Sequence, residues 1–389
     1  LSAQADGFRR CECEECRKLD PPGPFNPNNI SDRNYAFINA VARQLAKTHP
    51  DRYIGALVYR QLRQPPETID EMAPNVYGYV TQNCATWWNP DNEVADRELT
   101  REWARRFKLP MGRYEYYGLG TFTPRFYPHA LDRQVKFDHE MGFDSQYTEV
   151  YTFLPHTAPM IWAFAKLQWD TSADIDALLE EFYHRMFGDA AETMGEYYGL
   201  LETAWNTPRP GRDDGMLAVS RNAEQQCLAI SPEQMETGIE LLDRALAEAR
   251  DEKVKKRIDI VRSALFFSKY GIDSYLMNRQ IRQMPLEDAE DASALLRKLA
   301  DYSTLIAERD AFWTETKQRG DLLAETVIGL DDKKHYLMTD TFDQIDLGVL
   351  GTACTLVDWY REHAPEEVPE VQSTFAGMDL PEPIAVAID

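Results

Sequence analysis

The sequence is poor in basic residues and lacks long apolar runs. Its 389 residues include 42 lysines and arginines against 65 aspartates and glutamates, which gives a formal net charge of −23. This acidity disfavours nucleic acid and anionic membrane surfaces as partners. No apolar run approaches the roughly 20 residues that a membrane-spanning helix needs, so no membrane span is expected. The apolar share of 43% is nevertheless enough for a sizeable core.

Several catalytic signatures are also absent. The chain has no glycine-rich phosphate loop, dinucleotide fingerprint, HExxH zinc motif or GxSxG nucleophile elbow. Its seven histidines do not cluster, and only His156, in the expected loop after the last strand, is placed to contact a ligand. No cofactor for catalysis is therefore expected.

Strand and helix patterns alternate through the first 165 residues. We expect strands at 1–6, 53–59, 76–81, 113–117 and 145–153, and helices at 34–47, 98–107 and 129–141. Such alternation is typical of a parallel sheet with helical crossovers. Because the chain also lacks an initiator methionine, we interpret residues 1–165 as the C-terminal part of a (β/α)8 TIM-type barrel whose first strands precede Leu1.

Helical patterns dominate the rest of the chain. Residues 166–363 are predicted to form an all-α domain, in which Ser231-Pro232-Glu233-Gln234 has the pattern of a capping box at the start of a helix. Residues 364–389 are rich in proline and acidic residues and are predicted to form an extended tail. The predicted fold class is thus α/β, a barrel followed by a helical domain.

Carboxylates follow the expected strands at the positions where a barrel carries its chemistry. They are Asp6, Glu115 and Glu149, and the last two should lie on adjacent strands. Since paired carboxylates cleave glycosidic bonds, we expect Glu149 to be catalytic with Glu115 or Asp6 as its partner. The alternative is that these groups pair with arginines or face solvent.

Aromatic residues accompany the carboxylates at the same strand ends. Aromatic faces stack on sugar rings, and their polar tips bond hydroxyl groups. The predicted substrate-binding residues are Tyr59, Trp87, Trp88, Tyr117, Tyr151 and His156. The pattern favours a carbohydrate substrate and leaves two functions open, a glycoside hydrolase or a non-catalytic carbohydrate-binding protein.

The cysteines are unevenly placed. Cys11, Cys13 and Cys16 form a C-x-C-x-x-C motif, and Cys84 could complete a set of four thiolates for structural zinc. The alternative is one or two disulfides, which an exported protein would favour. Four thiolates would leave no position for water, so catalytic zinc is disfavoured.

Several of these segments resemble one known family. They are Asp6-Gly7 followed by the cysteine motif, the helix containing Asn39-Ala-Val-Ala, the strand at 53–59, Trp169-Asp170, and Phe187-Gly188-Asp189-Ala190-Ala191. Over residues 1 to about 205 the chain is similar to the bacterial domain-of-unknown-function 4838 family.

The resemblance implies a relation to α-glucuronidase and β-N-acetylglucosaminidase barrels, including family 20 hexosaminidases. It implies action on oligosaccharides or N-glycans, with site roles for Glu149 and the Asp6 region, and a periplasmic or secreted location. If the general acid lies in the missing N-terminal half of the barrel, the chain would need that half as its partner.

Overall fold

The computed structural model describes residues 11–118, 121–150, 154–212, 223–321, 348–376 and 378. The chain divides into two compact units. The first comprises residues 1–117, 127–150 and 160–178, and the second comprises residues 118–126, 151–159 and 179–389. The chain therefore passes between the units several times.

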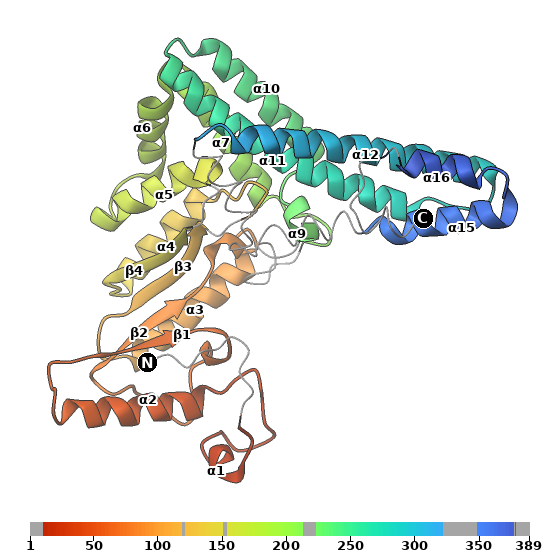
Figure 1. Cartoon of the computed structure of the whole chain (residues 1–389). Helices are drawn as coiled ribbons and strands as arrows, with labels where there is room; N and C mark the ends of the chain where they lie inside the picture. Colours follow the sequence, from red (N-terminus) through yellow and green to blue (C-terminus); the bar gives the residue numbers. More distant parts are fainter. Residues whose placement is uncertain are drawn as a thin grey trace. The chain divides into compact units, whose positions relative to one another are not determined.

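A parallel sheet forms the centre of the first unit (Figure 1). Its strands are β1 (Ile54–Val58), β2 (Val76–Thr81), β3 (Gly112–Gly118) and β4 (Ser145–Val150), in the order β1-β2-β3-β4. In the register, Val58 lies beside Val80, and Val80 lies beside Arg113. These strands confirm the ones expected from the sequence after residue 50, to within a few residues.

The prediction of a (β/α)8 barrel is wrong. The four strands of the described residues form a row, and the sheet does not close on itself. The sequence pattern could not decide closure, because a βα unit has the same hydrophobic pattern in an open sheet as in a barrel. The strand expected at 1–6 lies outside the described residues.

Helices cover one face of the sheet. They are α2 (Ser31–Ala46), α3 (Pro90–Arg106) and α4 (Pro128–Glu140). Alternate residues of β1 and β2 point toward this layer and are buried with Trp103 of α3 in one hydrophobic core: Ile54, Ala56, Val58, Val76 and Val80. Short helical turns, α1 (Glu14–Arg17), η1 (Arg60–Leu62) and η2 (Cys84–Thr86), lie in the connections.

A buried polar network continues this layer beneath β3. Arg113 and Asp138 are both fully buried, and the Arg113 Nε donates to Asp138 Oδ2 at 2.8 Å. The same guanidinium donates to Gln82 Oε1 at 2.6 Å and to Thr100 Oγ1 at 3.2 Å. Because these partners come from α4, the end of β2 and α3, Arg113 ties β3 to all three.

The remaining helices follow β4 along the chain. They are α5 (Leu154–Trp169), α6 (Ile175–Phe187), η3 (Gly188–Ala190), α7 (Ala191–Asn206), α9 (Ala223–Cys227), α10 (Pro232–Glu248), α11 (Glu252–Gln283), α12 (Ala289–Lys317), α15 (Leu350–His363) and α16 (Val368–Ala376). In the second unit, α10 packs against both α7 and α11, and α11 lies alongside α12 (Figure 1). Helix α15 packs against α12 and α16, and the short α9 contacts α11. Among the described helices, none is both long and apolar enough to cross a bilayer.

The start of α10 confirms the capping box. Ser231 Oγ accepts from the Gln234 backbone N–H at 3.2 Å, and the Gln234 side chain accepts from the Ser231 backbone N–H at 3.2 Å. These two bonds satisfy donors that the first turn of a helix leaves unpaired.

The extended tail predicted for 364–389 is wrong in its first part. Residues 368–376 form α16, whose Val371 and Phe375 are buried in a core shared with α11, α12 and α15. Pro369 does not prevent the helix, because the first turn needs no hydrogen bond from that position. Residues 379–389 lie outside the described residues.

We expect Gly78→Ala to lower the free energy of unfolding by about 1–3 kcal/mol. A β-carbon at Gly78 would overlap the ring of Phe107, which is 5% exposed and stacks on Trp103. Gly55, on the neighbouring strand, is a matched control because its β-carbon would meet nothing within 4 Å. Urea denaturation should show a loss for Gly78→Ala and little change for Gly55→Ala, and equal losses would contradict the packing argument.

Candidate functional site

The sheet face opposite α2, α3 and α4 carries a cluster of tyrosines. Successive residues of a strand point to opposite faces, so Tyr77 and Tyr79 share the face opposite Val80, and Tyr114 and Tyr116 share the face opposite Arg113. We define the tyrosine face as the side chains of Tyr59, Tyr77, Tyr79, Tyr114, Tyr116 and Tyr147.

Ring contacts and hydrogen bonds join these tyrosines across the strands. The ring centroid of Tyr114 lies 4.7 Å from that of Tyr147 and 5.5 Å from that of Tyr116. Tyr77 and Tyr79 lie 5.2 Å apart. Burial, together with the neighbouring Tyr59 phenol to which it is hydrogen-bonded, raises the pKa of Tyr116 above its usual range.

The tyrosine face also has polar groups between its rings. Ser145 of β4 lies with its Oγ 2.7 Å from the hydroxyl of Tyr77 and 3.3 Å from that of Tyr79. A β-carbon at Gly112 would overlap the Tyr79 ring and lie 2.7 Å from Ser145 Oγ. Because Gly112 has no side chain, the ring of Tyr79 on β2 can pack over the backbone of β3 at this position.

The carboxylate of Glu149, near the end of β4, contacts one of these tyrosines. The hydroxyl of Tyr114 donates to Glu149 Oε1 at 2.6 Å. Tyr147 is 52% exposed, and Glu149, two residues further along the strand, is half-buried. Because ligands of parallel sheets bind at the carboxyl ends of the strands, Glu149 lies where a ligand of this face would be held.

The backbone at the end of β1 is strained. Arg60 has a φ of +48°, and it is the one non-glycine residue with a positive φ in the described part of the chain. This conformation costs roughly 1–3 kcal/mol. Its guanidinium lies over the Tyr59 ring, 5.4 Å from the centroid, and its Nε donates to the Tyr59 hydroxyl at 3.0 Å. The strained turn thus places a cation at the edge of the tyrosine face.

Glu115 lies on the other face of the sheet. It is fully buried, and its carboxylate accepts hydrogen bonds from the backbone N–H groups of Cys84 at 2.8 Å and Tyr116 at 2.7 Å. Burial raises the pKa of Glu115 to about 7. The expected convergence of Glu115 and Glu149 does not occur, because the alternation along β3 turns Glu115 toward the helices while Tyr114 meets Glu149.

Two more predicted residues lie on the helix-covered side. Trp87 is 4% exposed, and its Nε1 donates to Asp96 Oδ2 at 2.9 Å. Tyr117 is fully buried, and its hydroxyl donates to Gln134 Oε1 at 2.7 Å. Both rings therefore belong to the packing between sheet and helices and not to the tyrosine face.

The other predicted substrate-binding residues are dispersed. His156 lies within α5 and is fully buried in the second unit, with Nδ1 3.2 Å from the Tyr197 hydroxyl. Burial lowers the pKa of His156 to about 4, so the ring is neutral at physiological pH. Trp88 is half-buried. Asp6 and Tyr151 lie outside the described residues.

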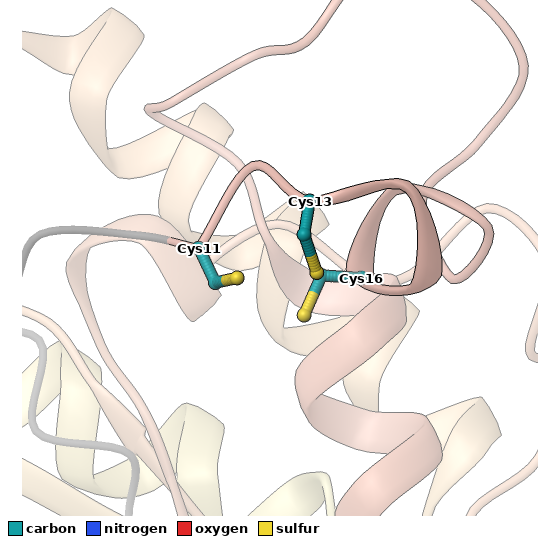
Figure 2. A group of neighbouring side chains, drawn as sticks. All are labelled: Cys11, Cys13 and Cys16. Carbon is teal, nitrogen blue, oxygen red and sulfur yellow. The ribbon is translucent and has the colours of Figure 1, made fainter.

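The cysteine motif forms a cluster at the start of the described chain. The Sγ atoms of Cys11, Cys13 and Cys16 all lie within 4.8 Å of one another and are turned toward one another (Figure 2). All three are free thiols. Hydrogen bonding with the Cys16 backbone lowers the pKa of Cys13 to about 7, and hydrogen bonding with the Cys11 side chain raises that of Cys16 to about 11.

The predicted set of four thiolates is therefore wrong in one member. Cys84 is buried at the start of η2, where its backbone N–H binds Glu115. Sequence spacing could not show this, because Cys84 comes from a different part of the fold.

The tyrosines that sequence reasoning did not assign to the site are Tyr77, Tyr79, Tyr114, Tyr116 and Tyr147. A signal for them was present in the sequence. Tyr77-x-Tyr79, Tyr114-x-Tyr116 and Tyr147-x-Glu149 each repeat at the two-residue spacing that places both side chains on one face of a strand.

The chain belongs to the family of the domain of unknown function DUF4838, whose model matches residues 2–199. This confirms the family expected from the sequence. The matched segment includes the tyrosine face, Glu149 and the three clustered cysteines. A search of curated proteins and a search of solved structures found no match.

We expect Glu115 to make stability depend on pH. Because its pKa is about 7 in the fold against an ordinary value of 4.5, the folded state binds more protons between these values, and stability falls as the pH rises. From pH 5 to pH 8 the wild-type protein should lose about 2–3 kcal/mol relative to Glu115→Gln, at about 1.4 kcal/mol per pKa unit. Urea denaturation at both pH values measures the difference, and parallel pH profiles would refute the assignment.

Proposed function

We propose that the tyrosine face binds carbohydrate. The observation that carries this proposal is the contact of the Tyr114 ring with the rings of Tyr116 and Tyr147, together with the hydrogen bond from Tyr114 to Glu149 near the carboxyl end of β4. Each ring offers an apolar surface for a sugar ring, and each hydroxyl offers a hydrogen-bond partner at its edge. The Glu149 carboxylate accepts hydrogen bonds, as sugar hydroxyls require.

The contrast between the two sheet faces supports a binding role. On the helix-covered face, β1 and β2 carry buried aliphatic residues such as Ile54 and Val80, whereas the tyrosine face is partly exposed. Parallel sheets are usually covered on both faces, and a covered face favours aliphatic residues. Rings with polar tips instead suit a surface that exchanges water for a ligand.

The charge of the chain narrows the ligand class. With a formal net charge of −23, the protein repels polyanions over long distances. An uncharged sugar chain avoids this repulsion. We therefore propose neutral oligosaccharides, with N-acetylglucosamine oligomers as the first to test. A ligand of this kind also implies a location outside the cytoplasm.

We expect Tyr147→Ala to weaken binding of a chitooligosaccharide by roughly tenfold, because the apolar area that a stacked ring buries contributes on the order of 1.4 kcal/mol at about 25 cal/mol per Å². Tyr147 is 52% exposed, so its removal should leave folding intact. A glycan array identifies the preferred oligosaccharide, and isothermal titration calorimetry then measures the affinity of wild type and variant.

Phe37→Ala is the matched control for this measurement. Phe37 is 57% exposed on α2, in the helical layer on the opposite side of the sheet. Its loss should leave the affinity unchanged. Equal weakening by both substitutions, or no binding of any glycan by the wild-type protein, would refute the proposal.

A second candidate is a glycoside hydrolase in which Glu149 is a catalytic carboxylate. The hydrogen bond from Tyr114 to Glu149 favours it, because such a bond positions a carboxylate for work on a bound sugar. Glycosidic cleavage needs a second carboxyl group facing the same bond. Of the two partners that the sequence suggested for Glu149, Glu115 lies on the opposite face of the sheet. We therefore propose Asp6 as the second carboxyl group.

We expect Glu149→Gln to reduce hydrolysis of chitooligosaccharides or p-nitrophenyl β-N-acetylglucosaminide by roughly 10²- to 10⁴-fold, the usual contribution of a positioned acid or base. Glu140→Gln, at an exposed position at the end of α4, is the control and should retain full turnover. Unchanged turnover in Glu149→Gln would exclude the hydrolase role of this residue. If the wild-type protein binds the sugar tightly but does not cleave it, only the binding function is supported.

A further inference from the structure

The three clustered cysteines are brought together by a backbone that has its own supports. The Arg17 and Lys18 backbone N–H groups donate to the carbonyls of Cys13 and Glu14 at 3.0 Å and 3.1 Å, which closes the turn of α1. The Leu19 N–H donates to the carbonyl of Cys16 at 3.2 Å. The sulfur positions therefore follow from a folded turn that does not depend on any bond between the cysteines.

Arg33 joins the segment around this turn to α2. Its Nη1 donates to the Cys11 carbonyl at 2.7 Å, and its Nε donates to Asp20 Oδ1 at 2.6 Å. The guanidinium groups of Arg17 and Arg33 lie over the Phe25 ring, 4.8 Å and 5.3 Å from its centroid. Arg33 thus holds the segment both at Cys11, where the cluster begins, and at Asp20, beyond its last cysteine. These contacts do not involve the cysteine sulfurs.

We propose that Cys11, Cys13 and Cys16 bind one Zn²⁺ ion through three thiolates and leave its fourth position to an external donor. This inference does not rest on the proposed carbohydrate function. Zinc–sulfur bonds are about 2.3 Å long, which places the sulfurs of a tetrahedral site roughly 3.8 Å apart. The Sγ atoms already lie within 4.8 Å of one another, so shifts of about an ångström would complete the site.

Three sulfurs fit one metal ion better than a disulfide. A disulfide joins two sulfurs and leaves the third cysteine without a role, whereas a zinc ion engages all three. Zinc and softer metal ions bind thiolate ligands well, whereas magnesium and calcium prefer oxygen ligands. On binding, three zinc–sulfur bonds form and the thiol protons pass to solvent.

The charge around the cluster suits this arrangement. Three thiolates with one Zn²⁺ carry a net negative charge, and the Arg33 guanidinium interacts electrostatically with Cys11 and Cys16. A cation at this position stabilises the thiolates and offsets part of the surplus negative charge.

The surroundings of the cluster indicate that the fourth coordination position of the zinc ion is filled from outside the described residues. Among the described residues, no histidine, carboxylate or further cysteine joins the three sulfurs in a common group. Two carboxylates of this segment have other partners, since Asp20 is paired with Arg33 and Glu15 with Lys18 at 2.6 Å. Cys11 and Cys13 are exposed, so a donor from solvent can reach the metal.

Cobalt substitution tests the site directly. The reduced full chain, titrated with Co²⁺, should develop a sulfur-to-cobalt charge-transfer band and the visible bands of a tetrahedral ion, and stoichiometric Zn²⁺ should abolish both. Cys11→Ser, Cys13→Ser and Cys16→Ser should each weaken Zn²⁺ binding by more than about tenfold, because even the loss of a residue that only supports a metal ligand costs roughly 10- to 100-fold in affinity. Cys84→Ser, which removes a thiol outside the cluster, should bind as the wild type does.

A second titration tests the open position. Imidazole added to the cobalt-loaded chain should shift the visible bands, because it can occupy the fourth position, whereas a site with four protein ligands would not respond. Circular dichroism checks that each serine variant is folded. Failure of the reduced wild-type chain to bind Co²⁺ or Zn²⁺, or binding that survives the loss of the cluster cysteines, would overturn the proposal. An imidazole-insensitive spectrum would overturn the open position.

Discussion

The buried ion pair between Arg113 and Asp138 is the interaction on which the arrangement of the first unit depends. Both groups are fully buried, and a buried charge that loses its partner costs several kcal/mol. The guanidinium also binds Gln82 and Thr100, so it can be satisfied only with β3 in one register and one orientation. Turning β3 over would bury the charge without these partners.

The orientation of β3 decides which side chains meet. With Arg113 turned toward the helices, Glu115 must follow it, and Tyr114 and Tyr116 must face the other way. The two glutamates that lie on neighbouring strands are therefore separated by the sheet itself. Burial raises the pKa of Glu115, whereas Glu149 is held by a tyrosine on a partly exposed face. One carboxylate belongs to the packing between the sheet and the helices, and the other lies on the tyrosine face.

The clustered cysteines depend on a separate set of contacts. Their positions follow from a short turn and from Arg33, which joins that turn to α2 through the Cys11 carbonyl and Asp20. The proposed metal site and the proposed carbohydrate site thus use different residues and different supports. A loss of one by substitution need not remove the other, which allows them to be tested independently.

The sequence by itself determined the strands of the sheet, the family and the local motifs. Periodicity predicted the strands β1 to β4, the capping box of Ser231 and Gln234 predicted the start of α10, and C-x-C-x-x-C spacing predicted the thiol cluster, because each depends on residues close together in the chain. Only the tertiary structure decided that the described strands form an open sheet, that Cys84 lies apart from the other cysteines, and that Glu115 and Glu149 occupy opposite faces. Those outcomes depend on contacts such as Arg113 with Asp138 that join distant segments, and no local pattern specifies them.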